Sequence, residues 1–126
     1  MMMTIGHKTW VIPGGRIPPH SAGREPSATS RDELCVLNTN EQGAQLEITV
    51  YYEDQPPVGP FRIYIEAQRM RVVRFNDLVD PVPILLDVPY SAVIQSDQPI
   101  VVQFTRIDTS AGAITTTMAY PDKTIS

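Results

Sequence analysis

The stretch AQLEITVYYE, residues 44–53, alternates apolar and polar side chains along its whole length. Successive side chains of a β-strand point to opposite sides, so an alternating stretch has one apolar face and one polar face. The apolar face predicted here carries Ala44, Leu46, Ile48, Val50 and Tyr52. The stretch is therefore predicted to form a strand with one buried side and one solvated side.

The same two-residue period recurs on both sides of this stretch and predicts an all-β chain. Further strands are predicted at residues 8–12, 33–38, 61–66, 69–75, 92–96, 100–108 and 114–120. In the last of these, Ile114, Thr116 and Met118 share one face. No stretch has a helical period longer than a turn or two. Many short strands separated by turns are typical of a β-sandwich or a barrel.

Residues with special backbone preferences separate the predicted strands. Turns are predicted at residues 13–15, 38–43, 55–60 and 96–99, and the last is expected to join two strands tightly. Two longer connections, residues 14–31 and 76–89, are rich in proline, glycine, serine and aspartate. Long irregular loops are uncommon in small domains and often carry function.

Length and composition place the chain among ordinary globular domains. With 126 residues, 42% hydrophobic and 19% charged, residues 1–126 are predicted to form a single domain rather than a disordered segment. Twelve prolines argue against a helical bundle, because proline breaks helix interiors. The net charge of −4 argues against nucleic acid as a partner, since phosphate binding needs clustered lysine and arginine.

The sequence also carries expectations about location. Its single cysteine excludes an internal disulfide, and its first residues lack the pattern of a secretory signal peptide. No apolar run approaches the roughly 20 residues of a membrane helix. We expect a cytoplasmic protein.

Motifs for catalysis or metal binding are not found. His7, His20 and Cys35 lack the spacing of a metal site, and Cys35 is better interpreted as a small buried hydrophobe. There is no GxSxG nucleophile motif, and the distances between carboxylates cannot be read from a sequence. The expectation is a protein with no catalytic residues, no metal and no cofactor.

Arginines gather on one predicted strand. Arg69 and Arg71 share a face by alternation, whereas Arg74 points to the other side. Guanidinium groups suit carboxylates, either within the domain or across a subunit boundary. A solvated, ion-paired sheet face and an anion-binding site both remain open at this point.

Several segments together resemble the sensory rhodopsin transducer family, and the resemblance covers essentially the whole chain. The segments are Trp10, 17–19, 50–54, 57–62, 74–78, 80–81, 93–96, 99–103 and 105–108. The resemblance implies a small cytoplasmic antiparallel β-sandwich of jelly-roll type that assembles as a homotetramer. It also implies, as partner, a membrane-bound microbial rhodopsin or another signalling protein, or else a sugar or other small ligand.

The leading hypothesis is a non-enzymatic signalling or binding module that acts as a homo-oligomer. The alternative is a carbohydrate-binding β-sandwich protein with or without weak glycoside hydrolase activity. A ligand site is expected where the two long loops meet an edge of the sandwich. Its candidate residues are Trp10, His20, Glu25, Asn76, Asp77, Asp80 and Arg106. Asn76 and Asp77 have a competing role as turn-building residues.

Overall fold

The alternating stretch forms the strand β3 (Ala44–Tyr51), and four of its predicted apolar residues, Ala44, Leu46, Ile48 and Val50, are buried. Tyr52 follows the strand and is half-buried. The structure is a computed structural model that describes residues 4–23 and 28–123. The pattern therefore predicts both the strand and the face that it buries.

The other elements follow in the order predicted, with shifted ends. They are β1 (His7–Gly15), β2 (Arg31–Asn38), β4 (Val58–Ile65), β5 (Arg69–Arg74), a 3-10 turn η2 (Phe75–Asp77), β6 (Tyr90–Asp108), β7 (Ala113–Met118) and β8 (Tyr120–Asp122). All pairings between these strands are antiparallel.

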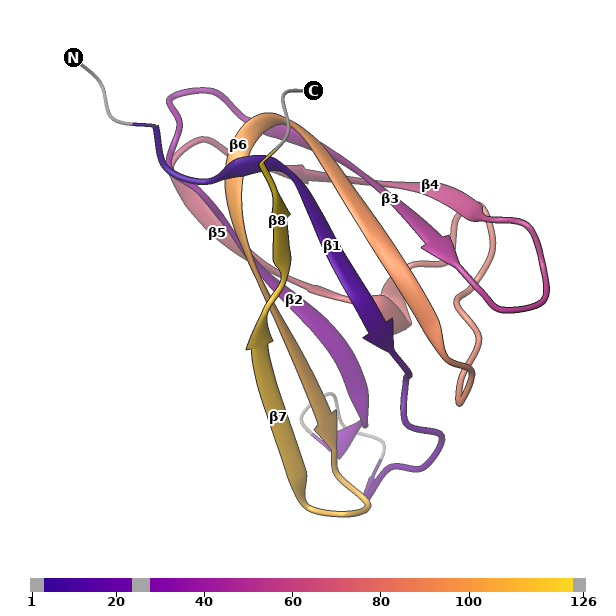
Figure 1. Cartoon of the computed structure of the whole chain (residues 1–126). Coiled ribbons are helices and arrows are strands. Elements are labelled where there is room, and N and C mark those ends of the chain that lie inside the picture. Colours follow the sequence, from indigo (N-terminus) through magenta and orange to yellow (C-terminus); the bar gives the residue numbers. More distant parts are fainter. Residues whose placement is uncertain (1–3, 24–27, 124–126) are drawn as a thin grey trace.

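The strands form two layers that share one strand. The first sheet has the order β4-β3-β6-β1-β8, and the second has the order β5-β2-β6-β7. The first part of β6, from Tyr90 to Ser96, pairs with β1 and β3. The later part, from Val101 to Asp108, pairs with β2 and β7, and Figure 1 shows the bend between the two parts. The predicted fold class, an all-β antiparallel sandwich of jelly-roll type, is confirmed.

The tight turn predicted at residues 96–99 is wrong, because one strand runs through it. Proline is poorly tolerated inside a central strand, since it lacks the N–H group for the ladder. Pro99 lies between Ser96, the last residue paired with β3, and Val101, the first paired with β2. The strand changes neighbours here, so the missing N–H group of Pro99 is tolerated.

Two other predicted turns also lie partly within strands. Residues 13–15 end β1, where the register with β6 shifts between Ile12 and Gly15. Of residues 55–60, the last three belong to β4. Residues 13–15 are an irregular strand end, whereas residues 55–57 remain the connection that leads into β4, and strand bulges also use glycine and proline.

The predicted strand at 114–120 is divided at Ala119, which is buried. The Ala119 backbone N–H donates to the carbonyl of Val102, 3.2 Å away. β7 pairs with the second sheet before this point and β8 with the first sheet after it. The face with Ile114 and Met118 is exposed, because β7 is an edge strand and these side chains lie outside the sandwich.

The hydrophobic core lies between the two sheets. Both sheets and both long loops contribute to it, including the fully buried Ile48, Leu34 and Ile17, and Leu78, which is 5% exposed. The Phe75 ring packs against Tyr90, with ring centroids 5.2 Å apart. The core therefore reaches the end of the sandwich where the long loops begin.

Candidate functional site

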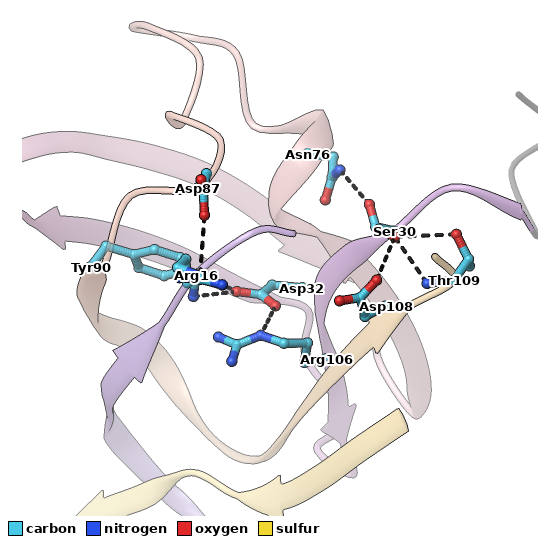
Figure 2. A network of polar contacts seen from close by, with 9 residues as sticks. All are labelled: Arg16, Ser30, Asp32, Asn76, Asp87, Tyr90, Arg106, Asp108 and Thr109. Atoms are coloured by element: carbon cyan, nitrogen blue, oxygen red, sulfur yellow. Dashed lines mark hydrogen bonds and ion pairs between the residues drawn. The ribbon is translucent and has the colours of Figure 1, made fainter. Parts of the chain in front are cut away.

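A buried carboxylate lies at the end of the sandwich where the two long loops meet. Asp32 shares the inward face of β2 with Leu34, and no part of it is exposed (0%). Its Oδ2 accepts hydrogen bonds from the Arg16 backbone N–H at 2.9 Å and from the Tyr90 hydroxyl at 2.8 Å. Its Oδ1 accepts one from Arg106 Nε at 3.0 Å, as Figure 2 shows.

The charge of Asp32 is balanced by Arg106. A buried carboxylate without a partner is costly, so such groups are found paired and hydrogen-bonded. The Arg106 side chain is 35% exposed, so this ion pair connects the core to the surface. A second pair, from Arg16 Nε to Asp87 Oδ1 at 3.4 Å, is exposed on both sides and stabilises the fold little.

Tyr90 is the neutral member of this group. Burial raises the pKa of its hydroxyl, and the nearby Asp32 carboxylate raises it further, so the phenol stays protonated and donates. Gly15 leaves room for the Tyr90 ring, because a Cβ at this position would collide with it. The position of the phenol therefore depends on a glycine at the end of β1.

Stability is expected to fall above pH 10, the ordinary pKa of tyrosine, because the unfolded state then loses the Tyr90 proton and the folded state keeps it. For this group the loss approaches about 1.4 kcal/mol for each pH unit. Urea unfolding between pH 8 and pH 11 measures this slope. Tyr90→Phe should have a shallower slope than the wild type. Equal slopes for the wild type and Tyr90→Phe would contradict this assignment.

A second polar cluster surrounds Ser30, just before β2. The buried Ser30 hydroxyl donates to the His20 carbonyl and accepts from the Thr109 backbone N–H at 2.9 Å. The Thr109 hydroxyl in turn donates to the Ala28 carbonyl at 2.7 Å. Asp108 Oδ1 lies near the same hydroxyl (Figure 2). These bonds fasten the first long loop to the end of β6.

Asn76 connects the second long loop to the same cluster. Its Nδ2 donates to the Ser30 carbonyl at 3.1 Å. Its buried Oδ1 has no hydrogen-bond partner among the described residues. This hydrogen bond joins residues 46 positions apart, so Asn76, the middle residue of η2, holds two loops together.

The structure brings His20, Asn76 and Arg106 to one end of the sandwich, and Asp77 follows Asn76 in η2. Asp77 is exposed, and the exposed Asp80 lines a separate hollow beside Arg62. Glu25 lies outside the described residues. The predicted set is therefore not one cluster in space.

Trp10 belongs to the core. It is 4% exposed, and its indole Nε1 donates to the carbonyls of His7 and Ile100 at 2.9 and 3.0 Å. The indole thus lies beside Ile100, which precedes Arg106 by six residues on β6. Six residues of a strand span about 20 Å. Trp10 therefore does not meet the loop residues.

Sequence reasoning missed Asp32, Ser30 and Tyr90, the residues that organise this end. The alternation of β2 could have identified Asp32. Asp32 is in phase with the apolar Leu34 and Val36, and a charged residue on the buried face of a strand needs a partner. The serine and the tyrosine carry no comparable pattern, because their roles come from contacts with distant loops.

A polar groove of about 550 Å³ crosses the outer face of the first sheet. Gln45, Glu47, Arg62, Gln95 and Asp97 are among its lining residues. Arg62 Nε donates to Glu47 Oε2 at 3.2 Å across β3 and β4. The groove offers carboxylate, guanidinium and amide groups, and none of them was among the predicted site residues.

Part of the outer face of the second sheet is apolar. We call this surface the apolar face and define it by Leu37, Met70, Val72, Val101 and Met118. A hollow of about 240 Å³ lies among most of these side chains. Three of them are strongly exposed, Met70 at 56%, Val72 at 46% and Met118 at 54%.

The neighbouring Cys35 is half-buried on this outer face. Burial raises the pKa of its thiol, and Glu33 raises it further. A thiol kept protonated is a poor nucleophile, so a reactive thiol is not favoured, but Cys35 is half-buried and not buried as predicted.

Within residues 4–23 and 28–123, no three histidine, cysteine, aspartate or glutamate side chains gather as a metal site would require. Over the same residues, no helix is long and apolar enough to cross a membrane.

Comparisons with known proteins agree with this architecture. The family model described as Anabaena sensory rhodopsin transducer matches residues 5–121. The solved structure of Anabaena sensory rhodopsin transducer is 47% identical, with a TM-score of 0.73, over 82% of this chain and 100% of that chain. A crystal structure of Thermotoga maritima 1070 is 28% identical, with a TM-score of 0.77, over 94% of this chain and 97% of that chain. No curated protein matches the sequence. The chain belongs to the Anabaena sensory rhodopsin transducer family.

Proposed function

We propose that this protein is a non-enzymatic signalling module that works as a cytoplasmic homotetramer and binds a partner protein. Membership of a transducer family is the observation that carries this proposal. A membrane-bound microbial rhodopsin or another signalling protein is the proposed partner.

The apolar face supports the homotetramer. Soluble monomers rarely expose large contiguous apolar patches, and such patches mark interaction surfaces. Met70, Val72 and Leu37 stand side by side on β5 and β2, where the register pairs Leu37 with Met70 and Cys35 with Val72. A second copy of the chain would cover these side chains.

Light scattering after size-exclusion chromatography tests the assembly. The wild type is expected at about 56 kDa, four times the chain mass of 14.0 kDa. Leu37→Glu/Met70→Glu should shift the protein to smaller species, because two carboxylates cannot be buried in an apolar interface. Tyr120→Glu, at an exposed position on β8, is the control and should leave the mass unchanged. A wild type that elutes as a 14 kDa monomer would refute the assembly.

The comparisons do not favour the alternative of a carbohydrate-binding protein with weak glycoside hydrolase activity. A sugar or other small ligand at the loop end, near His20, Asn76 and Arg106, stays a prediction. Calorimetric titration with a panel of glycans tests it. Absence of heat up to millimolar sugar would remove it.

A further inference from the structure

The strand β5 is an open edge with two different faces. In the described part of the chain it pairs with β2 alone, so its other side offers unpaired backbone groups. Alternate residues of an antiparallel strand direct both N–H and C=O to the same side. The side chains of Met70 and Val72 belong to the apolar face, and those of Arg69 and Arg71 point to the opposite face.

Arg69 and Arg71 have no carboxylate partner among the described residues. Arg16, Arg31, Arg62 and Arg106 each form an ion pair with an aspartate or a glutamate.

Arg69 and Arg71 instead donate to backbone carbonyls, those of Gln68 at 3.0 Å and Tyr64 at 2.9 Å. Both arginines are exposed. Two guanidinium groups with spare donors therefore stand side by side on an open strand.

A hollow of about 370 Å³ lies beside these arginines, between the end of β4 and β5. Tyr64, Ile65 and Glu66 line it from β4 and the turn that follows, and Arg69, Met70 and Arg71 line it from β5. Glu66 forms no ion pair with either arginine. The hollow is thus bounded by two positive groups, one negative group and an aromatic ring, next to backbone that can accept a strand.

We propose that the edge of β5 binds an extended acidic segment of a partner protein as an added β-strand. Strand addition derives affinity from main-chain hydrogen bonds and specificity from alternate side chains. Alternate residues on a strand lie about 7 Å apart, so acidic residues at every second position would meet Arg69 and Arg71 in turn. Apolar residues at the positions between them would extend the apolar face. This inference rests on the proposed role of the chain as a partner-binding module.

Charge decides between an acidic segment and a second copy of β5. Antiparallel pairing of two β5 strands centred on Met70 would place Arg69 of one copy opposite Arg71 of the other, and Arg71 opposite Arg69. Like charges directly opposite destabilise a strand pair, whereas opposite charges stabilise it. The edge therefore favours an acidic partner over self-pairing.

The test uses the full chain and a ten-residue peptide of alternating glutamate and valine, with an alternating lysine and valine peptide for comparison. Isothermal calorimetry measures affinity, and NMR-detected amide exchange locates the contact. The acidic peptide should bind and slow the exchange of β5 amides. Arg69→Glu/Arg71→Glu should weaken its binding roughly a hundredfold, since each charge-assisted contact contributes about tenfold. Arg62→Glu, at an exposed arginine on β4 of the other sheet, is the matched control and should bind as the wild type does.

Three results would overturn the inference. Absence of binding would mean that the two arginines serve only to keep the edge unpaired, as charges do on many edge strands. Binding without protection of β5 amides, or binding weakened equally by Arg62→Glu, would mean a diffuse attraction of charges. Protection of β5 amides in the free protein that is lost on dilution would mean self-pairing.

The assembly gives an independent control. Arg69→Glu/Arg71→Glu should keep the oligomeric mass of the wild type, because these side chains point away from the apolar face. A tetramer that fails to bind the peptide would refute this inference and leave the proposed module intact. A monomeric wild type that binds the peptide would refute the tetramer alone.

Discussion

Replacing Asp32 by alanine is expected to lower the free energy of unfolding by about 3–5 kcal/mol. The substitution removes the acceptor of three hydrogen bonds, from Arg16, Tyr90 and Arg106. It leaves the buried Tyr90 hydroxyl without its partner and Arg106 without its counter-charge. Loss of one partner costs more than the pair itself contributes, because the remaining polar groups stay buried.

Urea unfolding followed by circular dichroism measures the Asp32→Ala effect. Asp32→Asn should cost less than the alanine variant, because the amide oxygen can still accept one or two of these bonds. Glu53→Ala, at an exposed position, is the control and should remain within about 0.5 kcal/mol of the wild type. An Asp32→Ala protein as stable as this control would show that the carboxylate does not hold the loop end together.

Replacing Trp10 by alanine is also expected to cost about 3–5 kcal/mol, as for other large aromatic residues in cores. The variant leaves a cavity between the sheets, and the carbonyls of His7 and Ile100 lose their indole donor. If Trp10 instead served a ligand at the surface, its removal would change affinity and leave the stability nearly unchanged.

Thermal unfolding by circular dichroism is the measurement for Trp10, since this residue is the single tryptophan and its fluorescence disappears with it. Trp10→Phe separates the two contributions, because it keeps much of the apolar volume and loses only the N–H donor. Tyr51→Ala, on the exposed face of β3, should unfold close to the wild-type temperature. Wild-type stability of Trp10→Ala would place this residue outside the core.

Periodicity predicted the strands well, and local turn patterns predicted their ends poorly. β3 buries the side chains that alternation assigned to it, and the arginines of β5 divide between its faces as expected. The turn at residues 96–99 is wrong, since serine, aspartate and proline there also suit a strand that changes neighbours. The exposure of Ile114 and Met118 could not be predicted, because alternation shows that a face is apolar and not what covers it.

The candidate site was predicted only in part, because a sequence pattern does not show which distant segments contact one another. The proline-rich loops indicated the end of the sandwich at which Asn76 contacts Ser30 and Arg106 contacts Asp32, and a ligand site there stays a prediction. Asp32 was overlooked, although its phase on β2 marks it as buried. Trp10 was misplaced because composition cannot tell an aromatic platform from an aromatic core.

The strand shared by both sheets also governs the order in which this protein can assemble on the ribosome. β1 pairs with β6 and β8, so Thr9 cannot pair with its partner Gln95 until that residue has been synthesised. β3 and β4 are neighbours along the chain and can form a hairpin much earlier. Pairing between distant strands makes folding slow, and waiting apolar strands attract chaperones. Until β6 leaves the exit tunnel, the nascent chain can form the β3–β4 hairpin but lacks the strand that joins the two sheets. The synthesis of β6 then allows both sheets to be completed together.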